Sequence, residues 1–368
     1  MPDSNKGALW RKAKRYSSIK YLFAILDTAY LLALLLIFTA SGSSKALAQR
    51  FIVLAPGSYF YIPLYLLAIS MAYYALNFPL NFYSSYILEH KFALSGQKIG
   101  DWAKDQLKGG VIYYIISLIL LFIFYYIAGT FLRDWWWILS ICWIFFSLIL
   151  AKLTPVIIIP LFFKYKRLSN DALRGRIMNL ADKMGVKLLD VFEIDFSRKT
   201  MKANAAFVGM GKTRRVILAD TLKDKYSDDE IEVILAHEFA HYKLKHLLKL
   251  ILVNSASTVA VFYLIYRTSG YLLEVFGLSS LMDIAALPVV IIYMVLFGMI
   301  TQPFGNYISR CFEMDADRMA LLVTGKREAF ISTMNKLADQ NLSDRNPHPL
   351  IKFFFFDHPP IDERINLP

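Results

Sequence analysis

Residues 231–246 read IEVILAHEFAHYKLKH and contain the pattern His-Glu-x-x-His at 237–241. On a helix, residues four apart lie one turn above each other, so the imidazoles of His237 and His241 can converge on one metal ion. Glu238 then lies beside that ion, where its carboxylate can accept a proton from an attacking water without occupying a coordination position. The pattern therefore predicts a zinc site that performs hydrolysis.

The residues before this motif predict where its helix begins. Ser227 is followed three residues later by Glu230, which is the spacing of a capping box. Asp228 and Asp229 lie between them, and acidic residues in a first turn suit the positive end of the helix dipole. Apolar residues at the spacing of one helical face follow, so this helix is expected to pack inward.

The rest of the chain is more apolar than a soluble protein. Of its 368 residues, 57% are hydrophobic and 15% are aromatic, and the mean hydropathy is +0.43. Six apolar runs are long enough to cross a bilayer. They are 21–40, 59–83, 111–131, 135–153, 247–266 and 287–304. The first run is longer than the apolar part of a signal peptide, so we expect an uncleaved span and a multi-pass membrane protein of mainly α-helical class.

The net charge of +12 is unevenly distributed along the chain. Lys and Arg gather before the first apolar run and after the second, fourth and sixth, whereas the other connections hold few of them. Loops on the cytoplasmic side carry this excess, so both termini and the His-Glu-x-x-His motif are predicted to be cytoplasmic. Membrane lipids with anionic headgroups explain the charge, and no nucleic-acid partner is expected.

A polar segment separates the fourth and fifth apolar runs. Apolar spacing predicts a helix over 171–185, and short runs predict strands at 188–194, 205–208 and 215–218, with a turn at 209–213. In zinc peptidases an edge strand beside the metal commonly holds the substrate backbone through main-chain hydrogen bonds. Asn204 and Ala205 begin the strand to which we assign this task; the alternative is an ordinary scaffold hairpin.

A second acidic pattern follows the sixth apolar run, where residues 312–317 read FEMDAD. Glu313 and Asp317 are four residues apart and share one helical face. Two histidines and one carboxylate leave a coordination position open, so Glu313 is the expected third ligand. Asp317 would hold the far nitrogen of a ligating histidine, whereas Asp315 points elsewhere. The neighbouring Cys311 is interpreted as a buried small side chain.

The third pattern lies at 357–364, which read DHPPIDER. Consecutive prolines stiffen the chain, so His358 is presented from a rigid corner, where it can donate to the oxyanion of a tetrahedral intermediate. Arg364 is expected to hold this corner by pairing with an acidic residue. His246 and His348 are interpreted as structural or solvated.

Together these segments resemble the type I CaaX prenyl protease family of integral-membrane zinc endopeptidases. The resemblance rests on 197–207, 237–241, 312–317 and 358–364 in this order, and residues 89–108 also resemble an amphipathic loop of that family. It implies a ring of six or seven transmembrane helices around a chamber, with a cytoplasmic gluzincin-like zinc domain that contains a small β-sheet. Relatives cleave the C-terminal tripeptide from prenylated proteins, so the expected substrate is a peptide or lipidated peptide.

The resemblance also implies roles for individual residues. One zinc ion per chain would be held by His237, His241 and Glu313, with Glu238 as the general base and His358 as a further catalytic group. The implied substrate-binding residues are Asn204, Ala205 and Arg364.

Four segments follow from this reading. Residues 1–163 form transmembrane helices and the amphipathic loop, and 164–246 form the metalloprotease domain with the motif helix. Residues 247–304 form two further spans, and 305–368 complete the catalytic domain. The family is described with seven spans, whereas six runs are counted here, and the compact chain favours a prokaryotic inner membrane over the endoplasmic reticulum.

Two alternatives remain open from the sequence. A heat-shock-type quality-control zinc protease shares the motif, but that group has two spans before it rather than four. A non-catalytic metal-binding membrane protein, such as a transporter, should carry ionisable residues inside its spans. The six runs hold few of them, chiefly Asp27 and Lys152.

Overall fold

The computed structural model describes residues 2–56, 59–209, 214–223 and 225–367. The described part contains six helices long and apolar enough to cross a membrane, as the six apolar runs predict. These helices are α1 (Pro2–Ala40), α3 (Tyr61–Phe82), α5 (Ile99–Thr130), α6 (Trp135–Leu153), α11 (His246–Val275) and α12 (Leu287–Thr324). Helices satisfy their own backbone groups, which lipid cannot do, so long apolar runs fold in this way.

Two of these helices continue through a wide π turn. The segment η1 (Tyr83–Ile87) joins α3 to α4 (Leu88–Lys91), and η2 (Thr154–Ile158) joins α6 to α7 (Ile159–Phe162). Proline removes a backbone donor and clashes with the preceding turn, which accounts for the second interruption at Pro155.

The predicted amphipathic loop at 89–108 is mostly helical. The chain after α4 is irregular only until α5 begins at Ile99. His90 is half-buried, and its two ring nitrogens lie 2.8 and 2.9 Å from the carbonyl oxygens of Tyr86 and Gln97. The sequence alone favours a solvated loop residue at His90, but both of its ring nitrogens contact the backbone.

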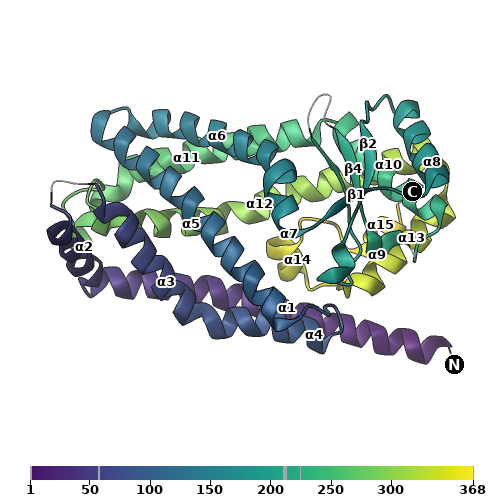
Figure 1. The fold of residues 1–368 in the computed structure, drawn as a ribbon, viewed down its shortest axis with the longest axis horizontal. Coiled ribbons are helices and arrows are strands. Elements are labelled where there is room, and N and C mark those ends of the chain that lie inside the picture. Colours follow the sequence, from purple (N-terminus) through teal and green to yellow (C-terminus); the bar gives the residue numbers. More distant parts are fainter. Residues whose placement is uncertain (1, 57–58, 210–213, 224, 368) are drawn as a thin grey trace.

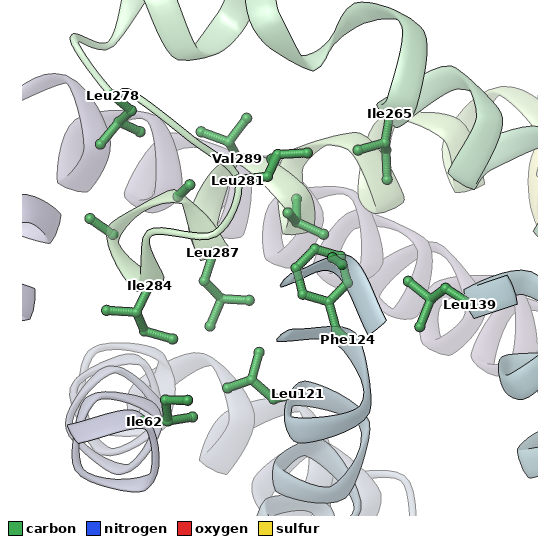
Figure 2. Packing of buried hydrophobic residues seen from close by; sticks show 14 of the residues in the cluster. Ile62, Leu121, Phe124, Leu139, Ile265, Leu278, Leu281, Ile284, Leu287 and Val289 are labelled. Atoms are coloured by element: carbon green, nitrogen blue, oxygen red, sulfur yellow. The ribbon is translucent and has the colours of Figure 1, made fainter. Parts of the chain in front are cut away.

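A large apolar cluster joins the transmembrane helices at the end of the molecule far from the sheet (Figures 1 and 2). It includes Ile62, Phe124, Ile265 and Val289, from α3, α5, α11 and α12. The short helices α2 (Ser43–Leu54) and η5 (Ile284–Ala286) close this end, where the Ser44 hydroxyl donates to the carbonyl of Ala285 at 2.7 Å. The cluster fixes the transmembrane helices relative to one another.

The polar segment forms a four-stranded sheet in the order β1-β2-β4-β3. Its strands are β1 (Tyr165–Arg167), β2 (Asp190–Ile194), β3 (Ala205–Val208) and β4 (Arg215–Ala219). β2 and β4 are parallel, and the other two pairs are antiparallel. β3 is an edge strand because it lies at one end of the strand order. The predicted strands are present with small shifts, β1 was not predicted, and the predicted turn lies outside the described residues apart from Gly209.

Helices α8 (Asp171–Lys183) and α10 (Asp228–Lys243) pack with the sheet in a second apolar cluster, and the short α9 (Asp220–Lys223) and η3 (Phe196–Arg198) lie in the connections. α8 ends as its sequence predicts, because Gly185 takes the left-handed conformation with φ +66°. α10 ends at Lys243 rather than continuing to His246, because Lys245 also takes a left-handed conformation, with φ +57°.

The C-terminal part returns to the sheet domain through α12, which continues from the membrane without interruption (Figure 1). It packs against α10 and carries residues 312–317 on its final turns. Three shorter helices then cover the domain: α13 (Arg327–Asn341), α14 (Pro349–Phe355) and α15 (Ile361–Ile365). The motif helix and the second acidic pattern are thus brought together across two membrane crossings.

Candidate metal centre

The motif helix α10 begins with the predicted capping box. The amide of Glu230 donates to the Ser227 hydroxyl at 3.3 Å, and the amide of Ser227 donates to the Glu230 carboxylate at 2.7 Å. Lys336 and Ser332 from α13 also donate to Glu230, at 2.7 and 2.6 Å. This anchored first turn fixes the register of the helix that carries His237 and His241.

The two histidines converge with Glu313 at one point. Their Nε2 atoms lie 3.0 Å apart, and the Glu313 carboxylate oxygens lie 3.3 Å from His237 Nε2 and 3.2 Å from His241 Nε2. One ligand atom from each of the three side chains lies within 4.8 Å of the other two. The structure thus brings together the three residues predicted as metal ligands.

The chemistry of this cluster fits a divalent cation. Glu313 Oε2 is buried and has no hydrogen-bond partner among the described residues, and a buried unsatisfied carboxylate oxygen is costly. The facing Nε2 atoms of His237 and His241 would both be satisfied by one cation placed between them. Two imidazoles and one carboxylate are the donor set of catalytic zinc sites with an open position.

Asp317 and Arg364 support His237 from behind. The Nδ1 of His237 donates to Asp317 Oδ1 at 2.8 Å, and Asp317 is fully buried. Arg364 donates to both oxygens of Asp317, at 2.7 Å from Nε and 2.6 Å from Nη2, and lies 3.6 Å from Glu313. The acidic partner expected for Arg364 is therefore Asp317, and this pair fixes which His237 nitrogen faces the cluster.

Sequence reasoning missed the residue that supports the second histidine. His246 is buried, and its Nδ1 lies 3.0 Å from Nδ1 of His241. Its ring stacks on Phe312, with centroids 4.3 Å apart and an interplanar angle of 7°. On a continuous helix a residue five positions on would point away from His241, but the break at Lys245 turns His246 back toward it.

Glu238 lies next to His237 and lines a cavity in front of the metal ligands. The pKa of its carboxyl group is shifted. Burial raises the pKa of Glu238 above its ordinary value, although the neighbouring imidazoles act in the opposite direction. A carboxylate with a raised pKa is a better proton acceptor and donor near neutral pH. This is the property expected of a general base that later acts as a general acid.

His358 reaches the cluster from the rigid corner formed by Pro359 and Pro360. Its Nε2 lies 3.4 Å from Glu313 Oε1, and its Nδ1 donates to Asp357 at 2.8 Å. The hydrogen bond to Asp357 raises the pKa of His358, and the negative charge of Glu313 acts in the same direction. A protonated imidazole beside the cluster is suited to stabilise developing negative charge.

A cavity of about 540 Å³ lies in front of these side chains. The residues predicted to bind substrate line it together with Glu238 and His358. These residues are Asn204, Ala205 and Arg364. Asp315 is exposed, as expected, but Cys311 is exposed as well, so its interpretation as a buried residue was wrong.

Known proteins match both the membrane part and the sheet domain of this chain. Residues 167–367 match peptidase family M48, and residues 4–164 match the N-terminal, five-membrane-helix region of CAAX prenyl proteases. An uncharacterized metalloprotease, YhfN, of Bacillus subtilis is 30% identical over 96% of this chain and 84% of its own length. CAAX prenyl protease 1 of Saccharomyces cerevisiae is 28% identical over 99% of this chain and 86% of its own length.

The crystal structure of Ste24p from S. mikatae superposes with a TM-score of 0.86 at 26% identity. The match covers 97% of this chain and 88% of the yeast chain. The match therefore extends over both the transmembrane helices and the sheet domain. The chain belongs to peptidase family M48, as a multi-pass membrane metalloendopeptidase related to the CAAX prenyl proteases.

Proposed function

We propose that the chain binds one zinc ion through His237, His241 and Glu313 and hydrolyses peptide bonds near the C-terminus of lipidated, membrane-associated substrates. The observation that carries the proposal is the convergence of three ligand atoms within 4.8 Å, including a buried Glu313 oxygen without a hydrogen-bond partner among the described residues. When bound there, zinc would supply Lewis acidity toward the scissile carbonyl and the attacking water. The remaining chemistry belongs to side chains of this protein.

Glu238 accepts the proton of the attacking water and passes it to the amine of the leaving fragment. Its raised pKa suits both transfers, because a carboxylate with such a pKa can hold the proton between the two steps. His358 donates a hydrogen bond to the carbonyl oxygen as negative charge develops on it. Asp317 keeps the proton of His237 on Nδ1, so that Nε2 remains available as a ligand.

The edge strand β3 supplies the binding surface for the substrate backbone. A strand at a sheet edge presents unpaired main-chain donors and acceptors, and an extended peptide can add to it. Asn204 and Ala205, at the start of β3, line the cavity that contains Glu238. Substrate binding by these residues, and by Arg364, is part of the proposal.

The lipidated substrate is proposed from the names of the relatives, several of which are CAAX prenyl proteases. The match of residues 4–164 to their N-terminal region favours this class over a heat-shock-type quality-control protease. The clusters of Lys and Arg support placing both termini and the metal centre on the cytoplasmic side. The described residues contain six candidate spans, and an even number of crossings would put the two termini on one side.

The test combines metal analysis with cleavage of matched peptides. Purified protein in detergent should contain one zinc per chain and should cleave an S-farnesylated C-terminal peptide faster than the same peptide without the lipid. Equal rates would remove the lipidated substrate from the proposal. Absence of stoichiometric zinc in active protein would contradict the proposed metal.

A further inference from the structure

The cavity extends from the metal centre to the first helix of the chain. Four residues of α1 line it at the spacing of one helical face. They are Tyr16, Ser17, Lys20 and Tyr21. Two contacts fix this face in place: the buried Ser17 hydroxyl donates to the carbonyl of Leu342 at 3.0 Å, and the Tyr21 ring lies 5.8 Å from that of Phe355. α1 is therefore a wall of the substrate cavity as well as a membrane span.

The direction of a bound peptide follows from the edge strand. Antiparallel pairing is the more stable arrangement, so a peptide added to β3 would run from Val208 toward Asn204. Its C-terminal side would then leave the sheet beyond Ala203, which also lines the cavity. The neighbouring Lys202 bonds to the hydroxyl of Tyr16 at 2.9 Å, so this end of the strand lies against α1.

Lys20 is the positive group available at this end. Among the described residues that line the cavity, the lysine and arginine side chains are Lys20 and Arg364, and Arg364 lies at the metal centre, where it bonds to Asp317 and is 3.6 Å from Glu313. Lys20 lies 3.6 Å from Glu89, which is too long for a hydrogen bond, and its side chain is 41% exposed. Its ammonium group therefore has donors available to a ligand.

Glu89 also has two other partners, which weakens its hold on the Lys20 ammonium group. One carboxylate oxygen of Glu89 accepts from the Tyr16 hydroxyl at 2.6 Å, and the other lies 3.1 Å from the Lys202 ammonium. Glu89 is thus already neutralised without Lys20.

Four carboxylates line the cavity, at Glu238, Glu313, Asp344 and Asp357, and they repel an anion. His358, beside Glu313, and Lys20, on α1, offset this repulsion. On the α1 wall of the cavity, Lys20 is the described lining residue that attracts a carboxylate. A lysine at this position also suits a membrane interface, but that role alone does not require its side chain to line the substrate cavity.

We propose that Lys20 binds the free C-terminal carboxylate of the substrate and so selects for cleavage close to a chain end. The inference rests on the proposed peptidase function and adds a specificity-determining residue to it.

The test compares two peptides that differ only in the terminal group. Both are fluorescently labelled, S-farnesylated peptides ending in Cys-Val-Ile-Ala, one with a free carboxylate and one with a carboxamide. Wild-type protein should cleave the free acid with kcat/KM about tenfold higher, as expected for a charge-assisted contact worth about 1.4 kcal/mol. Lys20→Met should reduce this ratio to about one, chiefly by raising the KM of the free acid.

Two variants serve as controls. Lys20→Arg keeps the positive charge and should keep the preference for the free acid. Lys12→Met removes a charge from an exposed position of the same helix that does not line the cavity, and it should behave as wild type. A preference retained in Lys20→Met, or lost equally in Lys12→Met, would overturn the assignment, as would equal cleavage of both peptides by wild type.

A binding measurement separates this inference from the proposed function. Fluorescence anisotropy of the same peptides with the Glu238→Gln protein reports affinity without turnover. Tighter binding of the acid that is lost on adding Lys20→Met supports the Lys20 site even if no peptide is cleaved. Equal affinity for acid and amide overturns it even if the protein is an active peptidase.

Discussion

Replacement of Asp317 by Asn tests the support of the metal centre most directly. Asp317 is fully buried, accepts a hydrogen bond from His237 and pairs with Arg364 through both of its oxygens. Asparagine preserves the shape but removes the charge. Among the described residues, Glu313 at 3.6 Å would remain as the ion-pair partner of the buried Arg364 guanidinium.

Two separate losses follow from this change. Breaking a buried ion pair by removing one partner costs about 3–5 kcal/mol, and the oxygen that Asn retains places the expected loss near 3 kcal/mol. The orientation of His237 is also weakened, and loss of such a supporting carboxylate lowers metal affinity about 10–100-fold. We therefore expect both a lower unfolding temperature and weaker zinc binding.

Zinc affinity is measured by competition with a chromophoric chelator, and stability by thermal unfolding in detergent with zinc in excess. Asp315→Asn is the matched control, because Asp315 lies on the same helix, is exposed and pairs only with Arg318 among the described residues. Asp315→Asn should leave both quantities unchanged. Zinc affinity of Asp317→Asn within twofold of wild type would refute the reasoning.

The double variant Asp317→Leu with Arg364→Met separates the two losses. It replaces the buried pair by apolar side chains of similar size, which is often neutral for stability. We expect the unfolding temperature to recover and zinc affinity to remain low. Recovery of both would show that Asp317 acts on the fold alone.

Glu238→Gln should lower peptide turnover about 10²–10⁴-fold because the general base is lost, while zinc content measured by mass spectrometry stays at the wild-type level. Removal of metal with a chelator should abolish cleavage and lower the unfolding temperature, and added zinc should restore both; activity that survives complete metal removal would exclude the proposed centre. Burial alone would raise the pKa of Glu230, but hydrogen bonds from Lys336 and Ser332 hold that pKa below its ordinary value of 4.5. The stability contributed by this carboxylate is present above a pH of about 4.5 and declines as the pH falls through the lowered folded-state pKa. Thermal unfolding between pH 7 and pH 3 should therefore show a smaller acid loss in Glu230→Gln than in wild type, and identical pH profiles would contradict this account.

The fold was predictable where one physical pattern dominates a segment. Apolar length identified the six spans, and the capping box located the first turn of α10. Boundaries were less predictable where a helix leaves the membrane. α12 continues to Thr324, well past the end of its apolar run near Phe304, because polar residues can extend a helix once the backbone is already helical. Strand β1 is three residues long and two of them are charged, so it carries no alternating pattern.

The residues of the metal centre could be predicted from the sequence, whereas the contacts that support them could not. Local spacing placed His237 with His241, and Glu313 with Asp317, on single helical faces. The contact between Arg364 and Asp317 joins residues 47 positions apart, and no local pattern identifies such a partner. The contact of His246 with His241 could not be predicted, because its orientation depends on the left-handed Lys245, a residue type that rarely adopts this conformation.

The unbroken course of α12 has a mechanical consequence. Glu313 is 26 residues beyond Leu287, so one helix of about 39 Å, with Pro303 in its interior, connects the apolar cluster at the far end of the molecule to the metal centre. If the helix tilts about the cluster as a unit, a change in tilt of about 5° displaces the Glu313 carboxylate by about 3 Å, which is larger than the tolerance of a metal–ligand distance. We therefore expect zinc affinity to vary with the acyl-chain length of the surrounding lipid, and an affinity that is constant from short to long chains would show that α10 and α13 hold Glu313 in place independently of the membrane.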